Sequence, residues 1–291
     1  MNLWRQTEAT TAKAIQSGAL QPIPTVSETV YENNYCYLLR TLDNLRRKDN
    51  ALKRMQQAGD NNHNPFLPYD PDLFVCELGS QHVCLLNKFN VVEHHLLMVT
   101  RSFHPQSELL SRADFNAAAL CLAEVDGLIF YNGGTEAGAS QLHKHLQLLP
   151  STPAKALPLA TQLDHFSDTC STNSNLPFHQ AGIKVPEWLF DDPERAAHWL
   201  NNHYSELLSL LHIDIAGSTV ITPYNLLLTR RWMMLVPRSL ESVSGISFNA
   251  LAFCGAVLVR TDEQAEELKA MGISKTLRSV TGKTDRGYAA S

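Results

Sequence analysis

The 291-residue chain has little charge, no paired cysteine motif and no long apolar run. Charged residues make up 18% and the net charge is -5, so the chain has no general basic surface for duplex nucleic acid. No apolar run reaches the roughly 18 residues that span a bilayer. The amino-terminal segment also lacks the basic start and apolar core of a secretory signal. We therefore expect a cytoplasmic protein with no membrane or nucleic-acid partner.

The six cysteines are scattered and never occur as Cys-x-x-Cys, which favours free thiols over a disulfide framework. A zinc site built from Cys76, Cys84 and His82 remains the weaker alternative, because these residues could meet across a hairpin. We predict that the protein holds no metal of its own.

Hydrophobic residues make up 44% of the chain, which is typical of a globular protein. Runs rich in Val, Leu and Phe predict three strands over 72–78, 82–89 and 94–100. A capped helix is expected from Ser111 to Val125, because apolar residues follow the cap at helical spacing. Strands over 128–131 and 142–149 then flank a glycine-bearing loop at 132–141.

A stretch rich in Pro, Ser, Thr and Asn divides the chain into two predicted halves. We expect an N-terminal half at 1–155, a connection at 156–185 and a C-terminal half at 186–291. The C-terminal half should contain a helix over 192–211, a hairpin over 219–238 and a helix that starts at Thr261 and ends at Gly272. These elements predict an α+β fold in which helices flank an antiparallel sheet.

A row of polar side chains carries the functional signal. In a strand over 142–149, alternate side chains share a face, so His143, His145 and Gln147 point the same way. Lys144 and Leu146 then face the other way. Two imidazoles and an amide have little reason to line a core together, and the preceding glycine loop suits phosphate oxygens. Because neutral imidazole is a good nucleophile toward phosphorus, we predict nucleotidyl transfer through His145.

The segments GASQLHKHLQ, YNGG, LNKFNVVEHHLLMVT and YNLLLTRRWMMLVPR resemble the histidine-triad superfamily, specifically its diadenosine tetraphosphate phosphorylase branch, also called ATP adenylyltransferase. The resemblance implies a histidine-triad-like sheet with two halves around one nucleotide cleft. It also implies reversible phosphorolysis of diadenosine tetraphosphate to ATP and ADP. In that reaction His145 would attack the α-phosphorus, the carbonyl of His143 would orient its ring, and Gln147 would hold a non-bridging oxygen.

The resemblance implies that the partners are the small molecules diadenosine tetraphosphate, ATP, ADP and phosphate. When the family's binding positions are carried over to this sequence, the substrate contacts extend along much of the chain. The substrate-binding residues would be Lys48, Asn87, Lys88, Asn132, Gly138, Ala139, Ser140, Gln141, Asn225, Thr229, Met234 and Arg238. Physical reasoning suggests that Arg238 clamps the polyphosphate and that Met234 packs against a base. We expect no tightly bound cofactor, and any Mg²⁺ would travel with the polyphosphate.

Several alternatives stay open. Paired strand histidines also occur by chance or in zinc sites, and His94 and His95, which face opposite sides of a strand, are predicted to be packing or surface residues. The chain could instead be a uridylyltransferase-like enzyme, a dinucleoside polyphosphate hydrolase or a nucleotide sensor without catalysis. The sequence does not determine the oligomeric state.

Overall fold

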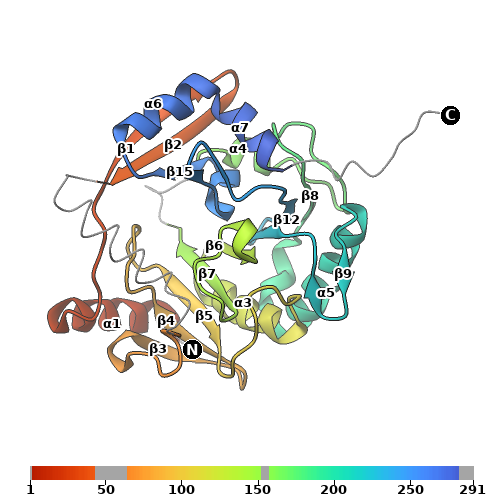
Figure 1. Ribbon diagram of the computed structural model, residues 1–291. Coiled ribbons are helices and arrows are strands. Elements are labelled where there is room, and N and C mark those ends of the chain that lie inside the picture. Colours follow the sequence, from red (N-terminus) through yellow and green to blue (C-terminus); the bar gives the residue numbers. More distant parts are fainter. Residues whose placement is uncertain (1, 43–63, 152–156, 282–291) are drawn as a thin grey trace.

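The computed structural model describes residues 2–42, 64–151 and 157–281, and its centre is an eight-stranded sheet (Figure 1). Every neighbouring pair of strands in this sheet is antiparallel. In spatial order the strands are β3 (Phe74–Leu78), β4 (His82–Leu86), β5 (Leu96–Thr100), β7 (His145–Pro150), β6 (Gly127–Gly133), β11 (Tyr224–Leu228), β12 (Trp232–Pro237) and β8 (Ala181–Lys184). Because β6 pairs with β11, the sheet is continuous across residues of both predicted halves.

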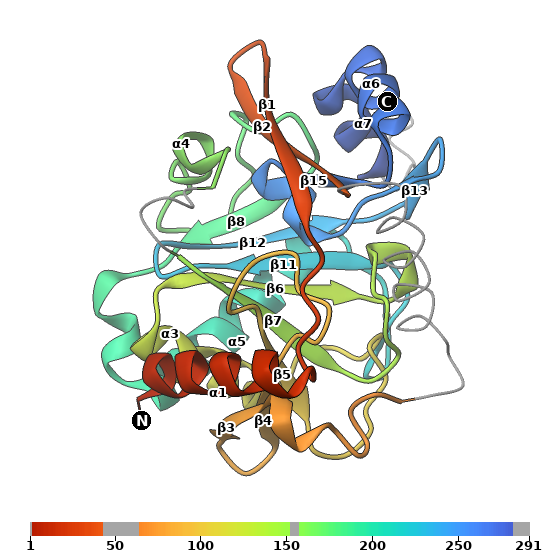
Figure 2. The same cartoon turned by 90° about the vertical axis from the view of Figure 1, so that its left-hand side faces the viewer.

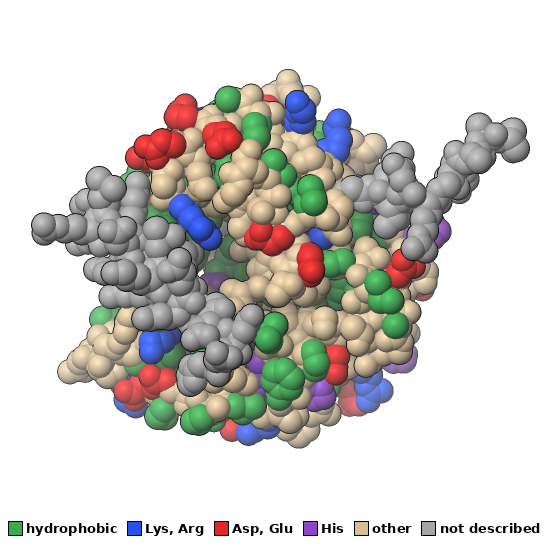
Figure 3. Space-filling model, in the orientation of Figure 1, with side chains coloured by type: hydrophobic (Ala, Val, Ile, Leu, Met, Phe, Trp, Pro, Cys, Tyr) green, Lys and Arg blue, Asp and Glu red, His purple; other side chains and the backbone are tan. Residues whose placement is uncertain are grey.

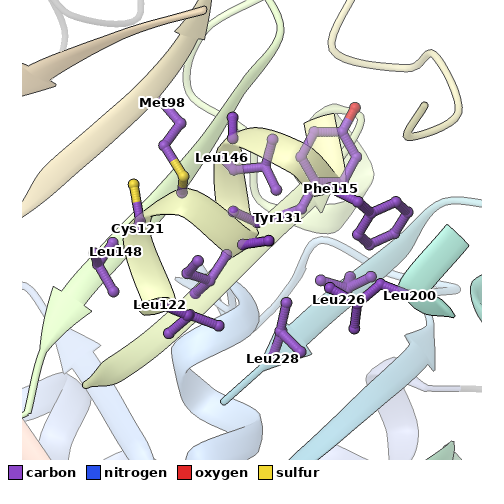
Figure 4. Packing of buried hydrophobic residues seen from close by; sticks show 14 of the residues in the cluster. Met98, Phe115, Cys121, Leu122, Tyr131, Leu146, Leu148, Leu200, Leu226 and Leu228 are labelled. Atoms are coloured by element: carbon purple, nitrogen blue, oxygen red, sulfur yellow. The ribbon is translucent and has the colours of Figure 1, made fainter. Parts of the chain in front are cut away.

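Three helices cover one face of this sheet, α1 (Leu3–Ser17), α3 (Arg112–Glu124) and α5 (Pro193–Leu210) (Figure 2). The helix cap expected at Ser111 is present as a capping box, in which the Ser111 hydroxyl accepts from the Asp114 backbone N–H and the Asp114 carboxylate accepts from the Ser111 backbone N–H. Figure 4 shows Met98, Leu146 and Leu148 of the sheet packed beside side chains of α3. This face of the sheet is therefore a closed apolar core.

A smaller sheet lies over part of the opposite face. It consists of β1 (Thr25–Glu32), β2 (Tyr35–Leu42) and β15 (Ala256–Val259), accompanied by α6 (Asp262–Met271), α7 (Ile273–Val280) and the short α4 (Ala160–Leu163). Two-residue strands form the pairs β9 (Ile215–Ala216) with β10 (Thr219–Val220) and β13 (Ser242–Val243) with β14 (Ile246–Ser247). The 3₁₀ turns are η1 (Pro71–Leu73), η2 (Thr135–Ala137), η4 (Glu187–Asp191) and η5 (Ala250–Cys254).

The predicted α+β fold is confirmed, with small shifts at element ends. The hairpin expected over 219–238 is β11 and β12, and the capped helices are α3, α5 and α6. The strand expected over 142–149 starts only at His145, and His143 forms a single bridge to Pro105. Strand β8 lies inside the expected connection at 156–185, and the division into halves stays a prediction.

Two further features bear on the predicted chemistry. All six cysteines are unpaired thiols. His82, proposed as an alternative zinc ligand, instead directs Nε2 to the carboxylate of Asp114 at 2.8 Å.

Within the described part of the chain, no helix is long and apolar enough to cross a membrane.

Candidate active site

Two of the three predicted catalytic residues face a cavity of about 1510 Å³ that lies between the two sheets. His145 and Gln147 of β7 line the cavity from the large sheet, and Asn132 lines it from β6. The smaller sheet supplies the other wall, which includes Arg40 of β2. Figure 3 shows this side of the molecule hollowed near its centre, with a cationic side chain at the edge of the hollow.

The imidazole of His145 is held in one orientation. Its Nδ1–H donates to the carbonyl oxygen of His143 at 2.8 Å, which leaves the lone pair on Nε2. Burial lowers the pKa of His145 to about 4, because a charged imidazole would lose its hydration in this site. At neutral pH the ring is therefore uncharged and can act as a nucleophile.

The ring of His143 does not line the cavity. Its Nε2–H donates to the carbonyl oxygen of Thr100 at 2.9 Å, and Nδ1 lies 3.0 Å from the Asn64 amide nitrogen. Burial lowers the pKa of His143, although its bonds to backbone carbonyls oppose that effect. The ring thus anchors residue 143 while its carbonyl orients His145.

Gln147 has a neighbour that the sequence analysis assigned to packing or surface. His95 of the segment before β5 is buried and lines the same cavity. The Asn87 amide lies 3.1 Å from its Nδ1, and burial lowers the pKa of His95 to about 4, with the Gln147 side chain opposing the shift. With Asn87 donating to Nδ1, the proton of neutral His95 sits on Nε2. That atom has no partner with hydrogen-bond geometry among the described residues, although Gln147 lies against it.

This arrangement sets the Nε2–H of His95 beside the side chain of Gln147. Its Nε2–H can donate to the amide oxygen of Gln147. The amide N–H groups of Gln147 then remain available to an anionic oxygen in the cavity.

The glycine loop adjoins this row and is held from behind by side-chain amides. The Asn132 side-chain oxygen accepts hydrogen bonds from the Asn225 amide at 2.8 Å and from the backbone N–H of Ala250 at 3.0 Å. Gly138, in the turn after η2, has φ of 87°. A Cβ atom there would lie 2.9 Å from the backbone of Asn249, so the turn requires glycine. The loop thus presents its backbone to the cavity in a fixed shape.

Comparison with known families decides what this site belongs to. A family model described as the Ap4A phosphorylase N-terminal domain matches residues 1–165, which is more than half of the chain. A second, described as the ATP adenylyltransferase C-terminal domain, matches residues 174–283. The chain belongs to the diadenosine tetraphosphate (Ap4A) phosphorylase family.

Individual relatives agree with this assignment. The chain is 29% identical over 239 residues to diadenosine 5',5'''-P1,P4-tetraphosphate phosphorylase 2 of Saccharomyces cerevisiae, covering 70% of this chain and 71% of that protein. It is 30% identical over 205 residues to protein APA1 of the same yeast, covering 62% and 61%. The crystal structure of yeast Ap4A phosphorylase Apa2 aligns with a TM-score of 0.78 at 24% identity over 98% of this chain and 96% of that chain, which shows a shared fold.

Within this phosphorylase fold, most of the predicted substrate residues meet at the cavity. The predicted residues that line it, besides His145 and Gln147, are Asn87, Lys88, Asn132, Gly138, Ser140, Gln141 and Thr229. Ala139, Asn225, Met234 and Arg238 do not line it. Lys48 lies outside the described residues.

The structure does not agree with the prediction that Arg238 clamps the polyphosphate. Its guanidinium is 3% exposed and donates to the Asn225 side-chain oxygen at 2.8 Å and to the carbonyl of Phe248 at 2.7 Å. It also donates to the carbonyl of Leu240 at 2.7 Å. Because the guanidinium is buried and both Nη1 and Nη2 donate within the protein, Arg238 supports Asn225, which in turn holds Asn132. Met234 of β12 is likewise buried in the core rather than exposed to a base.

The sequence analysis did not predict the two cations that line the cavity from the smaller sheet. Arg40 of β2 and Arg260, next to the end of β15, line the cavity from the smaller sheet. Burial lowers the pKa of Arg40. Since β15 pairs with β2 although more than 200 residues separate them, no local pattern could have placed these cations opposite His145.

Proposed function

We propose that this chain cleaves diadenosine tetraphosphate with inorganic phosphate, giving ATP and ADP through an adenylate on His145. One observation carries the proposal. The Nδ1–H of His145 is bound by the His143 carbonyl, and Gln147 opens into the same cavity from the same face of β7. The names of the yeast relatives, and a yeast Apa2 structure in complex with Ap4A, support this choice of substrate.

The first step forms a bond between His145 Nε2 and the α-phosphorus of one AMP unit. The bridging bond to the β-phosphate breaks, and its electron pair leaves with ATP. The ring becomes positively charged, and the His143 carbonyl stabilises that charge through Nδ1–H. Gln147 can donate to a non-bridging oxygen. It cannot supply an acidic proton, but a polyphosphate leaving group is a weak base and hardly needs one.

In the second step an oxygen of inorganic phosphate attacks the same phosphorus. The P–N bond breaks, His145 returns to its neutral form, and ADP leaves. Each step is a reversible transfer between oxygen and nitrogen, so the reaction should follow ping-pong kinetics. Because burial keeps His145 uncharged, the nucleophile is ready without a separate base.

The negative charge of the polyphosphate can be balanced by cationic side chains of the cavity, without a resident cofactor. Lys88, Arg40 and Arg260 line the cavity and can balance polyphosphate oxygens. We propose that the chain needs no tightly bound cofactor, that Mg²⁺ enters only with the polyphosphate, and that the protein works in the cytoplasm.

A product analysis tests the proposal. Incubation with diadenosine tetraphosphate should give ATP and ADP in equal amounts only when phosphate is present. Formation of ATP and AMP without phosphate would instead identify a hydrolase, and uptake of a sugar phosphate as acceptor would identify a uridylyltransferase-like enzyme.

Mass spectrometry after rapid quench tests the covalent step. Mixing with substrate in the absence of phosphate should add one adenylate to the peptide that contains His145. The His145→Ala variant should bind the dinucleotide without gaining this mass. An unmodified wild-type peptide together with normal turnover would contradict the covalent mechanism.

A further inference from the structure

A buried glutamine fills a gap in the sheet beside the catalytic histidine. The backbone ladder between β6 and β7 ends at the pair Phe130 and Gln147. Continued in this register, the ladder would join Tyr131 to Leu146 and then Asn132 to His145, but the two strands separate there and the glycine loop begins. The side chain of Gln106, from the segment between β5 and α3, occupies the gap and is 3% exposed.

Gln106 replaces the missing ladder bonds with its own amide. Its Oε1 accepts from the backbone N–H of His145 at 2.8 Å, and its Nε2 donates to the carbonyl of His145 at 3.1 Å. The same Nε2 donates to the carbonyl of Asn132 at 3.0 Å. Both donors of the amide and its acceptor are therefore used, and the reversed orientation would place the amide oxygen against two carbonyls.

The backbone of Gln106 is itself fixed. Its N–H donates to the carbonyl of Leu142 at 2.7 Å. The hydroxyl of Tyr131, from β6, donates to its carbonyl. Gln106 is thus a rigid bridge between the strand that carries the nucleophile and the strand that enters the glycine loop.

We infer that Gln106 is a positioning residue that sets the distance and angle between His145 Nε2 and the phosphoryl group held by the glycine loop. The inference rests on the proposed function. Attack on phosphorus needs a reacting distance of about 3–3.5 Å, and a shift of about 1 Å can cost on the order of 100-fold in rate. The Gln106 amide binds the backbone of His145 and the backbone of Asn132, where the glycine loop begins. It can therefore control the geometry of the attack without touching the substrate.

The main test compares two buried glutamines. Gln106→Ala should lower the rate of adenylylation at saturating dinucleotide, and the rate of phosphorolysis of the isolated adenylyl-enzyme, by about 100-fold each, with KM changed by less than about threefold. Gln180 is equally buried, but its amide donates to the carbonyl of Asn173 at 2.7 Å rather than to the backbone of His145 or Asn132. Gln180→Ala should lower the melting temperature without changing either rate of the folded enzyme.

A conservative variant separates positioning from packing. In Gln106→Glu a carboxylate would face two carbonyls, whereas the protonated form restores one donor and one acceptor. Burial should raise the pKa of this introduced acid. The turnover rate of Gln106→Glu relative to that of the wild type should therefore rise about tenfold from pH 8 to pH 6. A flat ratio, or equal rate losses in Gln106→Ala and Gln180→Ala, would overturn the inference.

Amide hydrogen exchange provides a readout that needs no substrate. The backbone N–H of His145 should exchange at least tenfold faster in Gln106→Ala, because its acceptor is gone, and should be unchanged in Gln180→Ala. Unchanged exchange in Gln106→Ala would contradict the bridge. If the bridge is seen by exchange but the wild type does not turn over the dinucleotide, the proposed function fails rather than the geometry.

Discussion

Residues 144–147, at the start of β7, carry opposite kinds of chemistry on their two faces. On the cavity face, His145 and Gln147 are polar groups without formal charge. On the helix face, Lys144 is 3% exposed and its ammonium lies 2.7 Å from the carboxylate of Asp114. His82 binds the other carboxylate oxygen at 2.8 Å. One face thus leaves hydrogen-bonding groups available to a ligand, and the other satisfies its charges within the protein.

This difference shows how one strand can be both reactive and rigid. Burial alone would raise the pKa of Asp114, but the hydrogen bond from His82 and the charge of Lys144 outweigh burial and hold that pKa well below its usual range. The resulting ion pair ties β7 to the first turn of α3, directly beside His145. Because this ion pair fixes the strand from the helix face, the polar groups on the cavity face remain available to a ligand.

The largest effect should come from the cavity face. Replacing the nucleophile in His145→Ala should lower the turnover rate by at least about 10⁴-fold, because no covalent intermediate can form. The free energy of unfolding should change little, since the variant also removes a desolvated imidazole. Steady-state kinetics and urea unfolding measure the two quantities. Residual turnover within tenfold of the wild type would show that another group attacks.

The matching change on the helix face should act on stability. Lys144→Met leaves the buried carboxylate of Asp114 with one partner fewer, which should lower the free energy of unfolding by about 3–5 kcal/mol. The turnover rate of the folded fraction should fall less than tenfold. Lys184→Met is the control, because its ion pair with Asp168 is exposed and should be worth less than about 1 kcal/mol. Equal losses of stability in both variants would remove the distinction between the faces.

Gln147→Leu should reduce the turnover rate by about 100-fold, because it removes a donor to the phosphoryl oxygen in the transition state. Gln162→Leu, on α4, removes an exposed amide bond to the carbonyl of Asn34 and should leave the rate unchanged. Single-turnover adenylylation is the measurement. A rate for Gln147→Leu equal to that of the wild type would exclude Gln147 from the chemistry.

The smallest expected effect concerns how the free energy of unfolding depends on pH, through the buried His95 in the cavity wall. The pKa of His95 is about 4 in the folded protein and about 6.5 when unfolded, so the unfolded chain binds more protons below pH 6.5. Stability should therefore fall as the pH drops from 6.5 toward 4. In His95→Asn this fall, measured by urea unfolding at pH 6.5 and 4.5, should be smaller by about 2 kcal/mol. Identical falls in both proteins would contradict a buried neutral His95.

Much of the fold and the centre of the site could be predicted from the sequence, because the signals are local. Strand alternation placed His145 and Gln147 on one face and Lys144 on the other, and the cap at Ser111 marked the start of α3. Helix caps and the two-residue periodicity of strands depend on residues only a few positions apart, so both can be recognised in the sequence alone.

Only the tertiary structure decided which distant groups meet that strand. The sheet order brings β5 and β6 to either side of β7, which sets His95 beside Gln147 and Gln106 against the backbone of His145. The same folding engages the guanidinium of Arg238 with carbonyls and sets Arg40 in the cavity wall. The sequence by itself determined which histidine is the proposed nucleophile and in which strand it lies. Its distant neighbours Gln106 and His95 came from the tertiary arrangement of the strands, which leaves no periodic signal along the chain.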